Sequence, residues 1–404
     1  MRLLAISEHF FPRLGGTVSY LHETLNALSS LGVDAELLVP GPEPTDWLPA
    51  DFAPPAYRLR WIDADFPARS DPDRGQRYKF CTRVARAVDE AISGPTRPDV
   101  LHVLFGLFVM ETLKTDLLRA AGIRTIATVH NLPPMECGRI RPDAAWSVRL
   151  REQFRLAAVT IKNNSRLRRH RYDTYVVPSE EVACRLRSVL PGAEVRVIGH
   201  GPTGALVSQM HPAATRRPSA GGPLRLLTVG GYVPHKRQHL IPSTARRLAD
   251  KGLAIRWDVA GPDGRVPGFF DSIAAEVEAS GLREQVVLHR AITVEELAAL
   301  YDKANLYIQP STEEGFCLTA LDAAAVGLPV IASPAGALPE ISTTSRGRLV
   351  PSDSVALADA IIDFVANCEW PERSEDTAEA VRKTFSWTAA ATALHGLYEA
   401  ASGA

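Results

Sequence analysis

The sequence predicts an α/β protein of two doubly wound domains, each with a parallel sheet covered by helices on both faces. Three observations carry this prediction. The chain of 404 residues is long enough for two domains of ~150–200 residues each. Short apolar runs alternate with longer amphipathic stretches, which is the rhythm of βαβ units. The alternation breaks over residues 208–222 and then restarts.

The first half of the chain contains short apolar runs that we expect to be buried parallel strands. They lie at residues 2–7, 34–39, 100–104, 124–129, 174–177 and 195–198. Between them, residues 18–31, 77–92 and 179–190 show the apolar spacing of helices. Residues 47–73 are rich in Pro and Asp, and we expect an irregular insertion there. Together these elements predict a first domain at residues 1–207.

A linker is expected at residues 208–222, where Pro, Gly, Ala and Arg leave no apolar period. The second domain is expected at residues 223–386, with helix-like stretches between its strands. The expected strands lie at residues 224–229, 254–260, 286–288, 306–309 and 330–332. We expect the last helix, at residues 387–404, to pack back on the first domain.

Composition and charge exclude several classes of protein. The 45 basic and 46 acidic residues balance, whereas nucleic-acid-binding proteins usually carry a basic excess. No apolar run reaches the ~18 residues of a membrane-spanning helix, and the N-terminal residues lack the apolar core of a signal peptide. Five scattered cysteines without a Cys-x-x-Cys pair indicate neither a disulfide framework nor a zinc site. We therefore expect a cytoplasmic protein.

Two glycines follow the first expected strand. Gly15 and Gly16 precede Thr17 at the start of a helix. Glycines there let the backbone approach a ligand closely, and the free N–H groups of the helix suit an anion. A plain tight turn explains the same residues equally well.

A second glycine pair opens the second domain. Gly230 and Gly231 follow its first strand and lead to Lys236 and Arg237 at the start of a helix. A lysine near a helix start is often only solvated, but a Gly-rich turn at a strand end favours a phosphate-binding role. The Gly-Lys-Ser/Thr order of a Walker loop is absent.

The most informative segment follows the strand at residues 306–309. We expect a helix from Gly315 or Phe316 to Val326, with Glu314 at its entrance. Asp322 then lies about two turns further, or roughly 10–12 Å along the axis. Two carboxylates at that spacing cannot form a close acid/base pair, but they can hold two ends of one elongated polar ligand. The free N–H groups of residues 315–318 would meet negative charge between them.

This segment resembles the hallmark of the family 4 glycosyltransferases, which have the two-domain GT-B fold. The family's E-x7-E motif is similar to Glu314-x7-Asp322, within the same surrounding frame. Further segments resemble family motifs in the right order, so that the resemblance covers nearly the whole chain. They are Gly15-Gly16, Thr128-Val129-His130-Asn131, Val177-Pro178-Ser179, Val197-Ile198-Gly199-His200-Gly201 and Phe385-Ser386-Trp387 with Tyr398.

The resemblance implies a GT-B enzyme that transfers a sugar from a nucleotide diphosphate sugar and retains its anomeric configuration. It implies that Lys236 neutralises the departing diphosphate, that Glu314 binds donor hydroxyls and that His130 faces the donor sugar. These three are the expected catalytic residues. The expected substrate-binding residues are Gly15, Gly16, Thr17, Asn131, Gly230, Gly231, Arg237, Arg290, Gly315, Phe316, Cys317, Leu318, Thr319 and Asp322.

Each expected role has a simpler alternative. His130 could be a core histidine at a strand end, and its position alone favours that interpretation. The family resemblance favours a functional role instead. Glu314 could only complement its helix dipole, which is worth ~0.3–1 kcal/mol. Asp322 could be a solvated helix residue, although the Ala- and Leu-rich helix around it argues against this.

The chain departs from the family pattern at several positions. Gly231 stands where the family usually has an Arg that pairs with the Lys on the diphosphate. Either Arg237 or Arg290 substitutes for it, or the donor binds differently. Asp322 replaces a ribose-binding Glu, and Cys317 replaces a common Gly. These departures motivate a second hypothesis, a nucleotide-sugar-binding partner without catalytic activity.

We expect no metal and no cofactor beyond the nucleotide sugar as co-substrate. The pairs Asp63/Asp65 and Asp71/Asp73 look like Asp-x-Asp metal sites, but they fall in the expected insertion and are more simply surface residues.

Residues 139–171 carry nine Arg and one Lys against two acidic residues. A solvated helix face is the favoured interpretation of this basic stretch, with an anionic acceptor or a membrane surface as alternatives. Its interleaved apolar residues suit a core face rather than a strong membrane face.

The expected partners are therefore a nucleotide-sugar donor and a small soluble acceptor, such as an intermediate of secondary metabolism. A lipid or polysaccharide precursor at a membrane surface is the alternative acceptor, and no nucleic acid is expected.

Overall fold

The computed structural model describes residues 1–11, 15–64, 74–95, 97–132, 145–211, 213–264, 266–367 and 370–400. The chain divides into two compact units. The first comprises Met1–Leu132, Thr160–Gly201 and Ser386–Ala404, and the second comprises Pro133–Val159 and Pro202–Phe385. The chain thus changes unit at 132/133, 159/160, 201/202 and 385/386, and its last helix belongs to the unit in which it began.

The first unit is built on a parallel sheet. Within the described residues its strand order is β3-β2-β1-β4-β5-β6-β7. The strands are β1 (Arg2–Ser7), β2 (Asp34–Gly41), β3 (Arg58–Asp63), β4 (Val100–Phe105), β5 (Arg124–Thr128), β6 (Thr174–Val177) and β7 (Val195–Val197). The order reverses between β1 and β4, which makes the carboxyl ends of these two strands the switch point of the sheet.

Side chains of the first sheet alternate between two cores, as the pleat of a strand requires. Leu3 and Ala5 of β1 enter one core, whereas Leu4 and Ile6 enter the other. A sheet that is covered on both faces explains why its strands are continuous apolar runs in the sequence. The helices of this unit are α1 (Gly16–Ser30), α2 (Arg74–Ser93), α3 (Leu107–Thr112), α4 (Thr115–Ala120), α6 (Glu180–Val189) and α15 (Trp387–Glu399).

The expectation of an irregular insertion at residues 47–73 is wrong in part. Strand β3 lies within it and pairs in parallel with β2, from Arg58 opposite Glu36 to Asp63 opposite Gly41. Leu59, Trp61 and Ile62 are only partly covered or buried at this edge position. A half-covered edge strand alternates polar and apolar residues, and this weak pattern is hidden by the neighbouring Pro and Asp residues.

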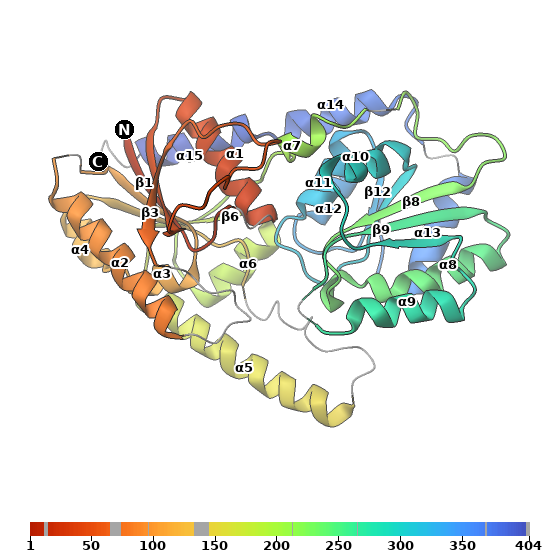
Figure 1. Cartoon of the computed structure of the whole chain (residues 1–404), viewed down its shortest axis with the longest axis horizontal. Coiled ribbons are helices and arrows are strands. Elements are labelled where there is room, and N and C mark those ends of the chain that lie inside the picture. The colour runs from red at the N-terminus through yellow and green to blue at the C-terminus, as the bar shows by residue number, and fades with distance from the viewer. Residues whose placement is uncertain are drawn as a thin grey trace. The chain divides into compact units, whose positions relative to one another are not determined.

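The last helix, α15, packs on α1 within the first unit (Figure 1). Leu394 and Tyr398 are fully buried there. The Tyr398 hydroxyl lies 2.7 Å from Nδ1 of His102 on β4, and Nε2 of the same histidine lies 2.8 Å from the Thr128 hydroxyl. Burial lowers the pKa of His102 to about 3, so that this linkage of helix to sheet runs through a neutral imidazole.

The second unit repeats the architecture. Its described strands form a parallel sheet in the order β10-β9-β8-β11-β12-β13. They are β8 (Leu224–Val229), β9 (Ile255–Ala260), β10 (Val286–His289), β11 (Leu306–Gln309), β12 (Val330–Ala332) and β13 (Arg348–Leu349). The switch point falls between β8 and β11. The helices are α7 (Gly204–Val207), η2 (Pro234–Lys236), η3 (Gln238–Leu240), α8 (Ile241–Asp250), α9 (Phe269–Ala279), α10 (Val294–Lys303), α11 (Leu318–Ala325), α12 (Leu338–Thr344), α13 (Ser354–Ala366) and α14 (Ser374–Thr384).

Residues 208–222, which the composition marks as a linker, are held against the second unit by a buried arginine. Arg216 is 1% exposed. Its guanidinium donates to the carbonyls of Tyr301, Asp302 and Ala304 at the end of α10, and to that of Val326 at the end of α11. One cation thus satisfies carbonyl groups at two helix C-termini, where positive charge is favoured.

Helix α5 (Trp146–Arg169) contains most of the basic stretch, and it is divided between the two units after Val159. Leu156 and Leu167 are buried, but several of its large apolar side chains are not. Trp146 is 77% exposed, Phe154 69% and Ile161 70%. The expectation that the apolar residues of this stretch form a core face is therefore wrong for most of them. In the described part of the chain, no helix has the length and apolarity needed to cross a membrane.

Candidate functional site

The glycine pair and the carboxylate motif of the second unit meet at the switch point of its sheet. Gly230 and Gly231 follow β8, and residues 310–317 follow β11. These two strands are hydrogen-bonded neighbours, so that their carboxyl ends place both loops side by side. Open parallel sheets bind ligands at this edge.

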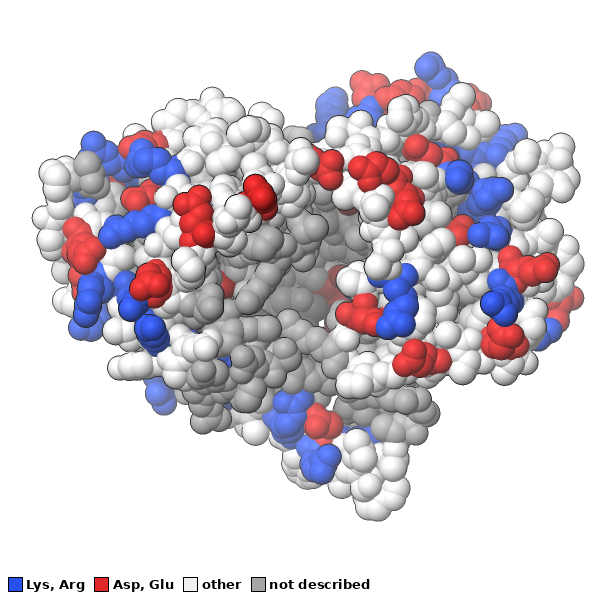
Figure 2. All heavy atoms as spheres, viewed as in Figure 1, with Lys and Arg blue, Asp and Glu red and all other residues white. Residues whose placement is uncertain are grey.

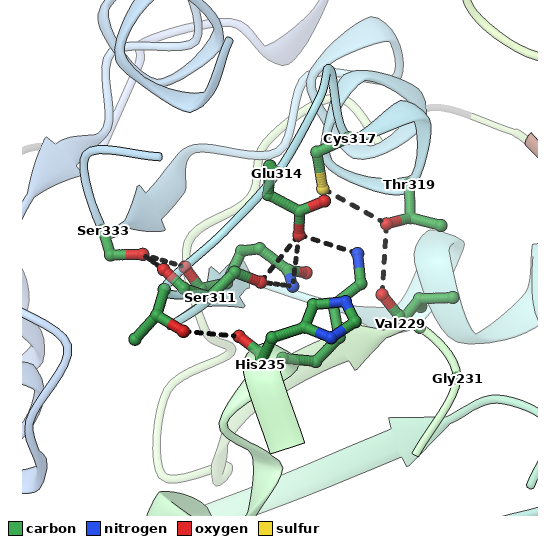
Figure 3. A network of polar contacts seen from close by, with 12 residues as sticks. Val229, Gly231, His235, Ser311, Glu314, Cys317, Thr319 and Ser333 are labelled. Atoms are coloured by element: carbon green, nitrogen blue, oxygen red, sulfur yellow. Dashed lines mark hydrogen bonds and ion pairs between the residues drawn. The ribbon is translucent and has the colours of Figure 1, made fainter. Parts of the chain in front are cut away.

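The centre of the site is a buried ion pair between Lys236 and Glu314 (Figure 3). The Lys236 Nζ lies 2.7 Å from Oε1 of Glu314. The same oxygen accepts a hydrogen bond from the Ser311 hydroxyl at 2.7 Å and a longer one from the Gln309 amide at 3.4 Å. Lys236 ends the short helix η2, and Arg237 then adopts the left-handed conformation with φ 60°.

Each charge of the pair stabilises the other. Burial alone would lower the pKa of Lys236, but the charge of Glu314 outweighs it and raises that pKa to about 12. Burial likewise opposes ionisation of Glu314, yet Lys236 and the Ser311 hydroxyl bring the pKa of Glu314 below its usual value. Both groups are therefore ionised near neutral pH. A buried charge at this position requires such partners.

A second polar layer supports the glycine turn. The Thr319 hydroxyl donates to the Val229 carbonyl at 3.1 Å, and the Cys317 thiol lies 3.6 Å from Thr319 Oγ1. Figure 3 shows these side chains next to the carboxylate of Glu314. The Tyr307 hydroxyl lies 2.9 Å from Thr319 Oγ1 and 2.9 Å from the amide oxygen of Gln309. The hydroxyls of Tyr307 and Thr319 both donate to the Val229 carbonyl and so hold the backbone at the end of β8.

The helix after Glu314 begins later than the sequence predicts. Helix α11 starts at Leu318, not at Gly315 or Phe316, and ends at Ala325. Cys317 has φ 81°, a left-handed conformation that the first turn of a helix cannot contain. Its position is one where glycine is favoured, which explains why a Cys there hides the start of the helix. The first-turn N–H groups therefore belong to Leu318 and Thr319 rather than to Gly315.

Asp322 lies on α11 and is 2% exposed. Its Oδ1 accepts a hydrogen bond from the Thr203 backbone N–H at 2.7 Å. Thr203 follows directly on the passage of the chain into the second unit. The carboxylate that the resemblance assigns to the donor ribose is thus engaged with the backbone at residue 203.

Arg237 and Arg290 are the two candidates to replace the arginine that is missing at position 231. The hydrogen bonds and ion pairs described for them go to other residues than Lys236 and Glu314. Arg237 donates to the Ser352 carbonyl at 3.1 Å. Arg290 pairs with Asp263, and its guanidinium lies 4.4 Å above the ring of Phe270. Gly231 itself has no left-handed backbone, and a Cβ there would first meet the Pro262 carbonyl oxygen at 3.7 Å.

Sequence reasoning missed Gln309, Ser311 and Gly336 as parts of this site. Gln309 and Ser311 are fully buried polar residues on either side of Pro310, a pattern that would have marked them. Gly336 has φ 58°, and a Cβ there would come within 2.7 Å of the Glu314 carbonyl oxygen. A glycine at position 336 therefore allows the backbone at Glu314 to pack directly against it.

The remaining expected residues belong to the first unit. His130 follows β5, and its Nε2 donates to the Leu104 carbonyl at 3.0 Å, which leaves Nδ1 as the acceptor. Burial lowers the pKa of His130 to about 4, so the ring is neutral near pH 7. The rings of Tyr20 and His200 lie 4.6 Å and 5.9 Å from it. The side-chain oxygen of the adjacent Asn131 is buried and has no hydrogen-bond partner within the described structure.

Gly15 and Gly16 are exposed at the start of α1, followed by a half-buried Thr17. Sequence reasoning missed Glu8, which follows β1 at the switch point. Its Oε1 accepts the backbone N–H groups of Phe108 and Val109 at 2.7 Å and 2.8 Å. This carboxylate therefore caps the start of α3 from the neighbouring strand end.

Across the ranges that the structure describes, no three His, Cys, Asp or Glu side chains gather as metal ligands would. Asp63 instead pairs with Arg83 at 2.6 Å. Residues 65, 71 and 73 lie outside the described residues. A reaction without metal stays a prediction.

Two family models match the chain. Residues 14–202 match "Glycosyltransferase Family 4", and residues 223–367 match "Glycosyl transferases group 1". Among curated proteins, the D-inositol 3-phosphate glycosyltransferase of Corynebacterium glutamicum is 26% identical over 98% of this chain and 96% of its own length. That of Streptosporangium roseum is 27% identical over 99% and 93%.

Solved structures show the same fold. A sucrose-phosphate synthase from Thermosynechococcus elongatus superposes with a TM-score of 0.74 at 23% identity, over 98% of both chains. The catalytic domain of starch synthase IV from Arabidopsis thaliana gives a TM-score of 0.67 at 16% identity, over 99% of both chains. Together with the two parallel sheets, these likenesses confirm the predicted GT-B fold.

Proposed function

Because the chain belongs to the family 4 glycosyltransferases, we propose that it transfers a sugar from a nucleotide diphosphate donor to an acceptor hydroxyl with retention of anomeric configuration. The observation that supports this proposal best is the buried Lys236–Glu314 pair at the switch point of the second sheet. Its ammonium group is placed beside the glycine turn, where a departing diphosphate would gather negative charge. Its carboxylate can accept hydrogen bonds from sugar hydroxyls.

The surroundings of Glu314 favour a binding role over a nucleophilic one. One of its oxygens already accepts hydrogen bonds from Lys236, Ser311 and Gln309. A carboxylate held by several donors, with a lowered pKa, is a weak nucleophile and a weak base. We therefore propose substitution on the front face of the sugar. The bond from the anomeric carbon to the phosphate oxygen breaks, the acceptor oxygen bonds on the same face, and its proton passes to the leaving phosphate.

The proposed acceptor is a small, soluble molecule that carries hydroxyl groups, such as an intermediate of secondary metabolism. The names of the relatives from Corynebacterium and Streptosporangium, which refer to D-inositol 3-phosphate, support a small polyol of this kind. The exposed apolar side chains of α5 favour a second candidate, an acceptor presented at a membrane surface. We propose that no metal takes part in the chemical step.

Replacement of either member of the central pair tests the proposed function. Lys236→Ala and Glu314→Gln should each lower the rate of sugar transfer by roughly 100-fold or more. The first removes the cation that stabilises the leaving diphosphate, and the second weakens the contact with the donor sugar. The measurement is product formation from UDP-, GDP-, ADP- and dTDP-sugars with a panel of polyol and lipid-linked acceptors. Lys251→Ala, an exposed lysine at the end of α8, is the matched control.

Breaking a buried pair can also unfold the protein. Thermal unfolding of each variant, and calorimetry with nucleoside diphosphates, therefore accompany the rate measurements. Folded variants with unreduced rates would contradict the assigned roles. Tight nucleotide binding without any transfer by the unchanged chain would favour the nucleotide-sugar-binding partner that Gly231 and the engaged Asp322 suggest. Inversion at the anomeric carbon, seen by NMR of the product, would contradict retention.

A further inference from the structure

Helix α5 presents a continuous apolar stripe to solvent. Trp146, Leu150, Phe154, Ala157 and Ile161 follow one another at intervals of four, four, three and four residues, which places them on one face of a helix. All five are exposed. Within the described residues, α5 also holds five of the eleven large hydrophobic side chains that are exposed. Exposed apolar groups are normally scattered, so a stripe of this kind indicates a surface that is covered by a partner.

The stripe is not the face by which the helix is attached. Leu156 and Leu167 are buried on another face of α5. Near its end, Arg166 pairs with Glu111 at 3.1 Å, and Arg168 donates to the Val189 carbonyl at 3.0 Å. These contacts hold the end of α5 in the first unit. They leave the face that carries Trp146, Phe154 and Ile161 directed away from a core.

The stripe is flanked by positive charge. The helix carries seven basic residues and one acidic residue, Glu152, which Arg155 neutralises at 2.6 Å. Helical spacing puts Arg151, Lys162 and Arg169 along one border of the stripe. Figure 2 shows basic and uncharged side chains, with an acidic group between the basic ones, at the lower edge of the view, where α5 lies.

We propose that α5 docks this protein in the plane of an anionic lipid bilayer. Its apolar stripe would enter the boundary between head groups and acyl chains, with Trp146 suited to that boundary by its amphipathic ring. Its basic border would contact the anionic head groups. Docking would bring the chain to the membrane-presented acceptor named above as second candidate, but it does not require that sugar transfer takes place.

Charge complementarity selects this occupant over a second copy of the chain. Two α5 helices packed stripe to stripe would bring their basic borders, each with Arg151, Lys162 and Arg169, close to one another. Such a contact gathers like charges, which is unfavourable. An anionic bilayer supplies apolar depth and negative charge together.

Vesicle sedimentation with the full chain tests the proposal. Vesicles of phosphatidylcholine alone are compared with vesicles that contain roughly one-third phosphatidylglycerol, at low and at physiological salt. We expect binding to the anionic vesicles only, and weaker binding at the higher salt. Phe154→Ser should lower the partition coefficient by roughly tenfold or more, since a large apolar side chain no longer inserts. Lys162→Gln should lower it by about fivefold.

Matched controls lie elsewhere on the surface. Leu117 on α4 is 62% exposed, and Arg283 is exposed beside Glu278. Leu117→Ser and Arg283→Gln should leave vesicle binding unchanged. Equal loss in these controls, equal binding to neutral vesicles, or no binding by the unchanged chain would overturn the proposal. Self-association in sedimentation velocity that Phe154→Ser abolishes would assign the stripe to a second copy and overturn it as well.

Discussion

The donor site depends on single residues that sequence position alone does not bring together. Lys236 and Glu314 are 78 residues apart in the sequence, and their charges meet at 2.7 Å because β8 and β11 are neighbours in the sheet. Gln309 and Ser311 add hydrogen bonds to the same carboxylate oxygen. The ion pair is thus held within a network of buried polar side chains.

Asp322 gives a prediction at the scale of one residue. Its carboxylate accepts the Thr203 N–H while almost completely buried. Asp322→Ala should lower the free energy of unfolding by about 1–3 kcal/mol, because that buried donor loses its acceptor. The measurement is urea unfolding, with Asp359→Ala on the exposed side of α13 as control. Unchanged stability together with lost nucleotide affinity would instead support a role confined to the ribose.

Two segments of the second unit differ from what their sequence alone suggests. Helix α11 begins only at Leu318, because Cys317 is left-handed. Residues 208–222 have the composition of a linker, yet Arg216 within them joins the ends of α10 and α11. A single buried cation therefore orders a segment that has no apolar period.

This arrangement predicts that the neighbouring residues Arg216 and Arg217 contribute very differently to the free energy of unfolding. Arg216→Ala should lower the free energy of unfolding by roughly 3 kcal/mol or more, because several buried carbonyl groups lose a charged donor. Arg217→Ala, at the next and exposed position, should change it little. Chemical denaturation of both variants measures the difference. A similar, small effect of both substitutions would show that Arg216 does not hold the segment.

The whole molecule consists of two doubly wound units whose sheets have separate switch points. The chain closes the first unit with its last helix, since α15 inserts Leu394 and Tyr398 beside α1 and β4. Stability of the first unit therefore depends on residues at the far end of the sequence. The residues of the proposed donor site, by contrast, all lie in the second unit.

A prediction at this scale separates the two dependencies. Leu394→Ala should lower the free energy of unfolding by about 2–5 kcal/mol through the cavity that it leaves. It should preserve the rise in melting temperature that UDP or another matching nucleoside diphosphate causes, because a ligand of the second unit stabilises that unit. Differential scanning calorimetry with and without nucleotide measures both effects, and Thr392→Ala on the exposed face of α15 is the control. Loss of the nucleotide-induced rise in Leu394→Ala would contradict this separation.

The sequence predicted most strands because strands covered on both faces are uninterrupted apolar runs, as in residues 224–229 and 306–309. It missed β3 and the two-residue β13, which lie at sheet edges and lack such a run. It singled out Lys236 and Glu314 because they follow a glycine turn or a strand end, whereas only the family resemblance singled out His130. It missed Glu8 and Ser311, because their partners are backbone groups and side chains that only the fold supplies.

Local patterning thus determined the order of most strands, the GT-B resemblance and the residues that carry charge at strand ends. Tertiary structure alone decided which charges meet, that Arg216 binds residues 208–222 to two helix ends, and that most large apolar residues of α5 face solvent instead of a core. The physical reason is that periodicity along a chain records which side chains share a face. It does not record what lies against that face, and burial and pairing are decided by contacts between residues distant in sequence.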